Sequence, residues 1–202
     1  MTDEELMLAI CKGDQSAYQA VVKEHLKPIS HYAYRLLGNQ KDTEDITQET
    51  FLKLWINAAT WQPEKSKLTT WLHRITHNLC VDYLRKHSRV QTQDNFEEHL
   101  VDSSEETNDR NVDFIQRDLC RNSEKIRILD SALNQLPENQ RSAIMLCTVQ
   151  NFSNKEAAVI MDISVKALES IIARGKRSLK SIIRTMADNG NTDELLEKQK
   201  VQ

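Results

Sequence analysis

Residues 153–186 read SNKEAAVIMDISVKALESIIARGKRSLKSIIRTM, and this stretch decides the fold of the last part of the chain. It opens with Ser153-Asn154-Lys155-Glu156, the pattern of a capping box, which predicts a short helix over 156–161. Residues 162–164 predict a tight turn that ends on Ser164, a favourable N-cap. A longer helix over about 165–186 then completes a helix-turn-helix.

The second of these helices is strongly basic, with Glu169 as its one acidic residue. A helical period gathers six side chains on one face, namely Lys166, Glu169, Ser170, Ala173, Arg174 and Arg177. A basic helix after a tight turn suits a reader of the DNA major groove, because its first half meets base edges while Lys and Arg neutralise phosphates. The alternative is an ordinary helical bundle with a solvated basic face.

Outward from this stretch, the whole chain has a helical composition. Hydrophobic residues make up 39% and aromatic residues 5%, and there are only four Gly and three Pro to form tight turns. We therefore expect an all-α protein with two small helical domains joined by a flexible acidic linker. The expected boundaries are 1–87 for the first domain, 88–122 for the linker, 123–187 for the helix-turn-helix domain and 188–202 for a polar tail.

Amphipathic patterns fill the first domain. Residues 2–5 resemble a capping box, and Gly13-Asp14 predicts a break before the next helix. Pro28 predicts the start of a further helix, and Asp42 is expected to cap a helix that runs to about residue 58. After a loop, another helix is expected over about 69–86.

Acidic residues outnumber basic ones in the expected linker, and hydrophobic residues are sparse there. Such a segment cannot bury enough surface to offset its ordering entropy. The net charge of the chain, −3, argues against a general nucleic-acid binder and makes the local basic helix more informative than the total.

Nothing in the sequence predicts export or a membrane span. The N-terminus is acidic, and no apolar run approaches the roughly 20 residues that a span needs. The four cysteines, Cys11, Cys80, Cys120 and Cys147, are far apart and form no Cys-x-x-Cys pair, so we expect reduced and mostly buried thiols. A cytoplasmic protein is the expectation.

Two parts of the chain resemble the extracytoplasmic-function subfamily of bacterial RNA polymerase sigma factors. LPENQR at 136–141, FSNKEAA at 152–158 and SVKALES at 164–170 resemble the family's C-terminal domain. DITQETFLKLW at 45–55 and TWLHRITHN at 70–78 resemble its other domain. Together the two stretches cover roughly three quarters of the chain in the family's order.

The resemblance implies a subunit that directs core polymerase to promoters, with no cofactor, no bound metal and no catalytic residue of its own. It implies contacts to the polymerase clamp and flap, to promoter DNA and to a probable class of inhibitor, an anti-sigma factor. The implied clamp-binding residues are Asp45, Gln48, Glu49, Phe51 and Trp55.

The resemblance also divides the DNA contacts between the two domains. The residues implied to capture the −10 element are Trp61, Lys65, Lys67, Arg74, Asn78, Arg85 and Lys86. Those implied to bind the −35 element are Arg141, Ser153, Lys166, Glu169, Ser170, Ala173, Arg174 and Arg177. In the family the linker threads toward the RNA exit path; a plain solvated spacer is the equal alternative here.

Three departures bear on the −35 preference. Gly175 interrupts the recognition helix at about 1 kcal/mol relative to Ala. Glu169 stands where a basic or polar base reader is common, and Glu accepts a hydrogen bond from cytosine. Asn151 replaces a frequent Gly in the turn and can adopt the left-handed conformation.

Other classes of protein remain as alternatives. One is an ordinary helix-turn-helix regulator that binds duplex DNA without polymerase. Another is a metal-dependent hydrolase using Asp42, Asp45 and Glu49, although no Glu-x-x-His partner motif accompanies them. His73, His77 and Cys80 have ligand-like spacing on one helical face, but we expect two surface histidines and a half-buried thiol.

Overall fold

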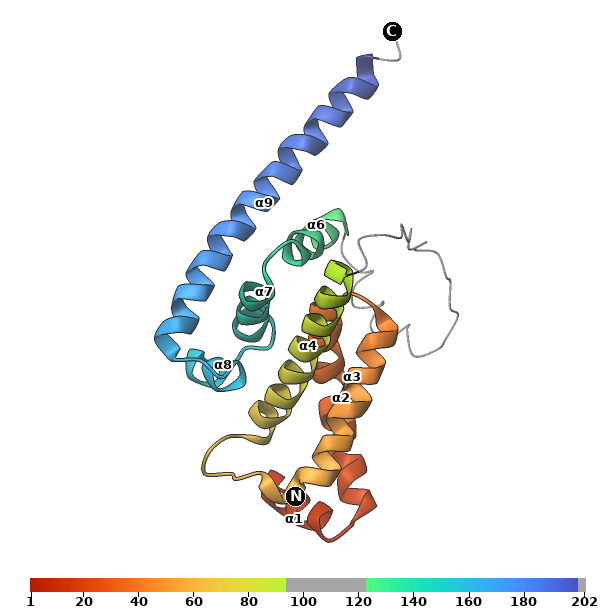
Figure 1. Cartoon of the computed structure of the whole chain (residues 1–202), viewed down its shortest axis with the longest axis vertical. Coiled ribbons are helices and arrows are strands. Elements are labelled where there is room, and N and C mark those ends of the chain that lie inside the picture. Colours follow the sequence, from red (N-terminus) through yellow and green to blue (C-terminus); the bar gives the residue numbers. More distant parts are fainter. Residues whose placement is uncertain (94–122, 200–202) are drawn as a thin grey trace. The chain divides into compact units, whose positions relative to one another are not determined.

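The computed structural model describes the backbone of residues 1–93 and 123–199, and side chains over 1–87, 128–129 and 131–186. Every regular element in these ranges is helical, which confirms the all-α prediction. The chain divides into two compact units, Met1–Arg121 and Asn122–Gln202, which are described separately (Figure 1). The predicted acidic linker falls mostly on 94–122, outside the described residues.

The N-terminal unit contains four α-helices and a short 3₁₀ turn within its described part. They are α1 (Asp3–Cys11), α2 (Gln15–Leu37), α3 (Gln40–Asn57), η1 (Ala58–Thr60) and α4 (Leu68–Gln93). The predicted capping box at the start of α1 is confirmed by reciprocal hydrogen bonds between Thr2 and Glu5. The predicted break is also present, because Gly13 has a φ of +84° and Asp14 caps α2.

Two predicted helix starts are wrong. Pro28 lies inside α2, which continues through it because His25, Ile29 and Tyr32 form one buried stripe on both sides of the proline. The N-cap of α3 is Asn39, whose side chain accepts from the backbone N–H of Asp42 at 2.8 Å. Asp42 instead lies in the first helical turn, where its negative charge suits the helix dipole.

The core of the N-terminal unit lies where α2 packs against α3 and α4. Its largest fully buried side chains come from these helices and include Tyr32, Ile29, Leu36, Leu54, Leu68, Leu72 and Val21. Helix α1 packs on α2 and η1 and adds Leu6, Met7 and Ile10 to the same core. This core leaves the outer faces of α3 and α4 exposed.

The C-terminal unit has five described helical elements. They are α6 (Ser123–Asn134), α7 (Glu138–Ile144), the π-helical turn η2 (Met145–Val149), α8 (Asn154–Ile160) and α9 (Val165–Gln199). Two residues have the left-handed conformation, Asn151 with a φ of 57° and Asp162 with a φ of 55°. The conformation predicted for Asn151 is therefore present, and Asp162 makes the turn between α8 and α9.

Gly175 has a packing role that the sequence did not reveal. A Cβ at this position would lie 2.9 Å from Cδ1 of Ile144 and 3.2 Å from Cβ of Gln140. Glycine therefore permits the close approach of α9 to α7, where its low helix propensity was the only predicted effect.

Both long helices extend past the boundaries expected from sequence. The backbone of α4 stays helical to Gln93, and that of α9 stays helical to Gln199. No described helix combines the length and the apolar character needed to cross a membrane.

Candidate nucleic-acid and partner interfaces

The helix-turn-helix is held by side chains at the start of each of its helices. The Ser153 hydroxyl accepts from the Glu156 N–H at 3.3 Å and donates to the Glu156 carboxylate at 2.7 Å, which confirms the predicted capping box. The Ser164 hydroxyl accepts from the Ala167 N–H at 3.2 Å and so caps α9. Leu168, which is fully buried, anchors the first turns of α9 in the core.

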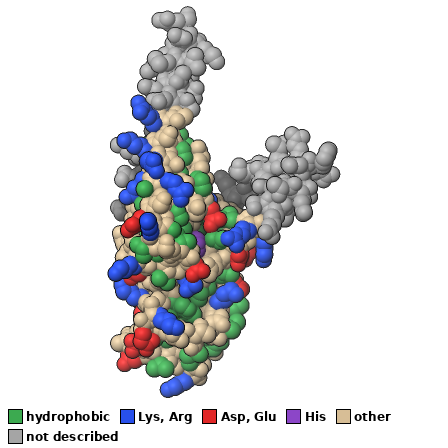
Figure 2. All heavy atoms as spheres, turned by 60° about the vertical axis from the view of Figure 1, so that its left-hand side comes forward, with side chains coloured by type: hydrophobic (Ala, Val, Ile, Leu, Met, Phe, Trp, Pro, Cys, Tyr) green, Lys and Arg blue, Asp and Glu red, His purple; other side chains and the backbone are tan. Residues whose placement is uncertain are grey.

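The predicted DNA-reading face of α9 is exposed along its described length. All six of its members, Lys166, Glu169, Ser170, Ala173, Arg174 and Arg177, are solvent-accessible. Figure 2 shows Lys and Arg side chains gathered along this helix. The Nε atoms of Arg174 and Arg177 each lie 3.4 Å from the carbonyl oxygen four residues earlier, which directs both guanidinium groups along the helix.

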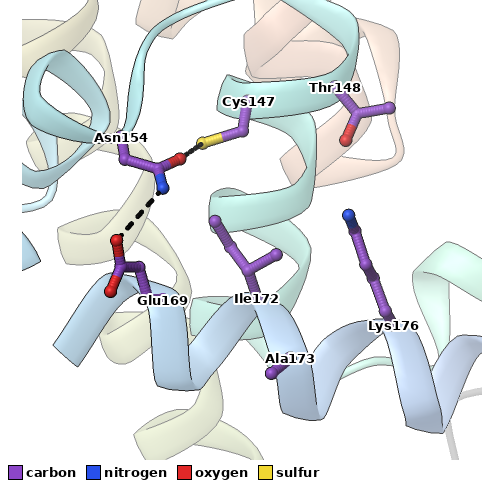
Figure 3. A pocket seen from close by; sticks show the side chains of 7 residues that line it. All are labelled: Cys147, Thr148, Asn154, Glu169, Ile172, Ala173 and Lys176. Atoms are coloured by element: carbon purple, nitrogen blue, oxygen red, sulfur yellow. Dashed lines mark hydrogen bonds between the residues drawn. The ribbon is translucent and has the colours of Figure 1, made fainter. Parts of the chain in front are cut away.

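Glu169 belongs to a hydrogen-bonded group that the sequence did not suggest. Nδ2 of Asn154 lies 3.5 Å from the Glu169 carboxylate, and Sγ of Cys147 lies 3.8 Å from Oδ1 of Asn154. The group borders a hollow of about 370 Å³ that also has Thr148, Ile172, Ala173 and Lys176 in its wall (Figure 3). It brings η2, α8 and α9 together at one place.

Arg141 lies apart from the α9 face and is half-buried. Its Nη1 donates to Oδ1 of Asn134 at 3.1 Å, which ties α7 to the end of α6. Burial lowers the pKa of the guanidinium, while the nearby Glu138 opposes that shift. The contacts of Arg141 are therefore those of a residue that joins two helices.

The exposed face of α3 carries most of the predicted clamp-binding residues. Asp45 and Gln48 are exposed, and Glu49 forms an ion pair with Lys53 at 3.3 Å. Trp55 is 36% exposed, with its ring packed edge-on against Tyr18 at 5.2 Å between centroids. These residues share one helical face, so they form a continuous surface.

Phe51 departs from that surface and corrects one expectation. It is only 4% exposed and belongs to the hydrophobic core, because its position on the helix turns it toward α2 and η1. Two residues that sequence reasoning missed take its place on the outer face, Leu52 at 50% and Ile56 at 67% exposure. Their spacing of four residues, in register with Gln48, was the available signal.

Helix α4 and the loop before it carry the predicted −10 residues. Arg74, Asn78 and Arg85 are exposed at spacings that place them on one face, and Lys65, Lys67 and Lys86 are exposed near the two ends. Trp61 is different, because it is 9% exposed and its Nε1 donates to the Ser66 carbonyl at 3.1 Å. Its indole closes the loop from inside rather than presenting a stacking surface.

The expectation of surface histidines on α4 is wrong. His73 and His77 are 2% and 5% exposed, and Cys80 is fully buried. The Tyr32 hydroxyl lies 3.0 Å from Nδ1 of His77, and Nδ1 of His73 lies 2.8 Å from the Thr69 carbonyl oxygen. Burial lowers the pKa of His77 to about 4. These side chains are structural groups between α2 and α4.

The geometry does not assemble the alternative carboxylate metal site. The Asp42 carboxylate accepts from the Tyr83 hydroxyl and from Asn39, away from Glu49. Burial, followed by the Asp42 carboxylate, raises the pKa of Tyr83 to about 12. Among the residues whose side chains are described, no cluster of three or more His, Cys, Asp or Glu is arranged to hold a metal ion.

The cysteines divide by environment. Cys11 is exposed, which corrects the expectation of mostly buried thiols for that position, while Cys80 is buried and Cys147 half-buried. All three are free thiols, and Cys120 lies outside the described residues.

Two family models match the chain, one in each unit. Residues 21–90 match sigma-70 region 2, and residues 126–179 match sigma-70 region 4. The first match covers most of α2 through α4, and the second covers α7, α8 and the first half of α9.

Curated relatives extend the similarity across both units. The chain is 32% identical to the ECF RNA polymerase sigma factor SigE of Mycolicibacterium smegmatis over 85% of its own length, and it spans 64% of SigE. It is 29% identical to the ECF RNA polymerase sigma factor SigW of Bacillus subtilis over 87% of its length and 93% of SigW.

Solved structures agree on the fold. CnrH in complex with the cytosolic domain of CnrY matches with a TM-score of 0.64 at 22% identity, over 91% of this chain and 97% of that chain. RpoE in complex with the anti-sigma factor NepR, from Bartonella quintana, matches with the same TM-score and identity over 83% and 96%.

Proposed function

Because the chain belongs to the extracytoplasmic-function group of RNA polymerase sigma factors, we propose that it binds core RNA polymerase in the cytoplasm and directs it to a set of promoters. The observation that carries the proposal is the presence of both sigma regions in one chain, in order, on two helical units. The chain acts as a binding subunit, and the polymerase performs the chemistry.

The outer face of α3 is the proposed docking surface for the polymerase clamp. It combines apolar and polar groups, Leu52, Trp55 and Ile56 beside Asp45, Gln48 and Glu49. Exposed apolar side chains ringed by polar contacts are typical of a protein interface. Trp55 is held by Tyr18 beneath it, so the ring is already ordered before it meets a partner.

The exposed face of α4 is the proposed site of −10 capture. Melted DNA needs a basic surface for its backbone and polar groups for its unpaired bases. Arg74 and Arg85 supply the charge, and Asn78 between them supplies an amide. Lys65 and Lys67 extend the basic surface into the loop that Trp61 holds closed.

The exposed face of α9 is the proposed reader of the −35 element. Its first turns carry Lys166, Glu169 and Ser170 toward base edges, and Arg174 and Arg177 meet phosphates. The Glu169 carboxylate accepts from the amino group of a cytosine. Ser153 contributes through its position at the start of α8, because its hydroxyl is engaged with Glu156.

Each unit offers a small contact area, and the net charge of the chain is negative. We therefore expect weak DNA binding by the free protein. Polymerase joins the two DNA contacts in one complex and raises the effective concentration of each at its element. The C-terminal unit is expected to contact the polymerase flap.

An anti-sigma factor is the proposed regulator. Two proteins of the same fold were solved as complexes, CnrH with the cytosolic domain of CnrY and RpoE with the anti-sigma factor NepR. Such a partner would act by covering surfaces that polymerase needs, and the exposed apolar residues of α3 are the natural target. The chain itself is not expected to insert into a membrane.

The test compares wild type with Asp45→Ala/Gln48→Ala/Glu49→Ala in a pull-down and in transcription with purified bacterial core polymerase. Wild type should bind core and initiate at discrete sites, and the variant should lose both. Glu4→Ala/Gln19→Ala/Glu24→Ala removes the same residue types from exposed positions on α1 and α2 and should behave as wild type. Tight binding to duplex DNA with no response to polymerase would favour a conventional regulator instead.

A further inference from the structure

Three side chains from three elements form a hydrogen-bonded series that ends on the DNA-reading face. Cys147 comes from η2, Asn154 is the first residue of α8, and Glu169 lies on the second turn of α9. Figure 3 shows the Asn154 amide between the other two, with its oxygen toward the thiol and its nitrogen toward the carboxylate. The series is thus a link from the domain interior to a proposed base reader.

The direction of these hydrogen bonds follows from the chemistry of the groups. An ionised carboxylate only accepts, so Asn154 must present its NH₂ group to Glu169. Its amide oxygen then faces Cys147 and needs a donor. Burial raises the pKa of the Cys147 thiol, an effect that Lys176 only partly opposes, so the sulfur keeps its proton and donates it.

The contact matters because a free glutamate side chain is mobile. An exposed Glu loses on the order of 1.5–2 kcal/mol of rotamer freedom when it is fixed, and a reader that is already held loses less on binding. Glu169 stands at the edge of a hollow of about 370 Å³, with Ala173 and Lys176 on the same helix wall. The small Ala173 side chain leaves space there for the edge of a base.

We propose that Asn154 is a positioning residue that orients the Glu169 carboxylate for reading a cytosine in the −35 element. This inference rests on the proposed function and adds to it a determinant of promoter choice that makes no base contact itself. Cys147 supports the arrangement by fixing which way the Asn154 amide faces.

A purely structural role for Asn154 makes the opposite prediction for one substitution. Asn154 follows the N-cap Ser153, and Asp in the first turn of a helix is favourable for the dipole. Asn154→Asp should therefore leave α8 intact. It also replaces the donor with a second carboxylate facing Glu169, which would turn the reader away from the base.

The experiment is transcription by the full chain with core polymerase on a library of promoters randomised across the −35 element, read by sequencing the transcripts. Wild type should prefer cytosine at one position. Glu169→Ala should lose that preference by about 5- to 150-fold, the range for one good base contact. Asn154→Ala and Asn154→Asp should each weaken the same preference by about 3- to 10-fold, the effect of releasing one side chain.

Controls separate orientation from charge and folding. Lys155→Gln lowers the charge by one unit at the neighbouring exposed position, as Asn154→Asp does, and should reduce output on all promoters without changing the ratio. Cys147→Ser keeps a donor and should retain the preference better than Cys147→Ala. In the Glu169→Ala background, Asn154→Ala should have no further effect on the ratio.

The outcomes distinguish the two levels of the argument. Absence of any promoter-selective transcription would overturn the proposed function. Selective transcription with a preference that Glu169→Ala leaves intact would remove Glu169 as a reader, and with it the role of Asn154. Loss of the preference in Glu169→Ala but full retention in both Asn154 variants would overturn the positioning role alone.

Discussion

The hydroxyl of Tyr32 lies 3.0 Å from Nδ1 of His77, and this buried hydrogen bond joins α2 to α4. The rings of Tyr32 and His73 are also close, at 5.6 Å between centroids. A polar group is thus built into the core beneath the proposed −10 surface. Its partners must remain neutral and paired for the two helices to stay together.

The first prediction is a loss of stability in mild acid. Burial holds the pKa of His77 at about 4 in the folded chain, against 6.5 when unfolded. As pH falls below 6.5, the unfolded chain therefore takes up a proton that the folded chain excludes, and about 3 kcal/mol is lost by pH 4. Above pH 6.5 this group has no effect.

Urea unfolding at several pH values, followed by tryptophan fluorescence, measures this loss. All three tryptophans, Trp55, Trp61 and Trp71, lie in the N-terminal unit, so the signal reports on that unit. His77→Gln should flatten the slope between pH 6.5 and 4. His25, whose pKa burial also lowers, accounts for a remaining slope. An unchanged slope in His77→Gln would exclude this origin.

The second prediction concerns Pro28, which has no N–H to donate within α2. Pro28→Ala should raise the free energy of unfolding of the N-terminal unit by about 1–3 kcal/mol, because Ala is the better residue in a helix interior. The same fluorescence experiment measures it. Pro63→Ala, in the exposed loop before α4, is the matched control and should give no such gain.

The third prediction concerns the approach of α9 to α7 at Gly175. Gly175→Ala gains about 1 kcal/mol of helix propensity but places a methyl group 2.9 Å from Cδ1 of Ile144. Overpacking of this kind costs about 1–3 kcal/mol, so we expect a net loss, and a larger one for Gly175→Val.

Hydrogen exchange of peptides from α7 and α9 in the full chain would measure the local opening. Ile144→Val removes Cδ1 and should restore protection in the Gly175→Ala background. If protection rises in Gly175→Ala alone, the contact with Ile144 adapts more easily than the geometry indicates.

The fourth prediction concerns the capping box of α8. Ser153→Ala should destabilise this helix by about 1 kcal/mol, because the Glu156 N–H loses its acceptor. Ser153→Thr keeps the acceptor and should retain most of the stability. Faster exchange of α8 amides in Ser153→Ala, with unchanged exchange in α4, is the expected pattern.

The sequence was most informative where local chemistry decides the structure. The capping boxes at Thr2 and Ser153 and the left-handed Asn151 follow from side-chain hydrogen bonding and backbone sterics within a few residues. The break before Asp14 is of the same kind. These features were predictable because no distant part of the chain competes with them.

Features decided by tertiary packing were not predictable in the same way. A helical period shows that His73 and His77 share a face, but a polar face reads as exposed unless its partner, here Tyr32, is known. Phe51 and Trp55 are four residues apart on α3, yet one lies in the core and the other outside it. The link from Asn154 to Glu169 spans the turn of the helix-turn-helix and needed coordinates.

The π-helical turn over Met145–Val149 has a consequence for how length changes would act on this chain. Its wide winding, with the Gln150 N–H bonded to the Met145 carbonyl, accommodates one residue more than an α-helix of the same rise. Losing a single residue there would leave α7 in place but rotate everything downstream by about 100°. A deletion one codon long, far from any DNA contact, would thus aim the whole reading helix away from the groove.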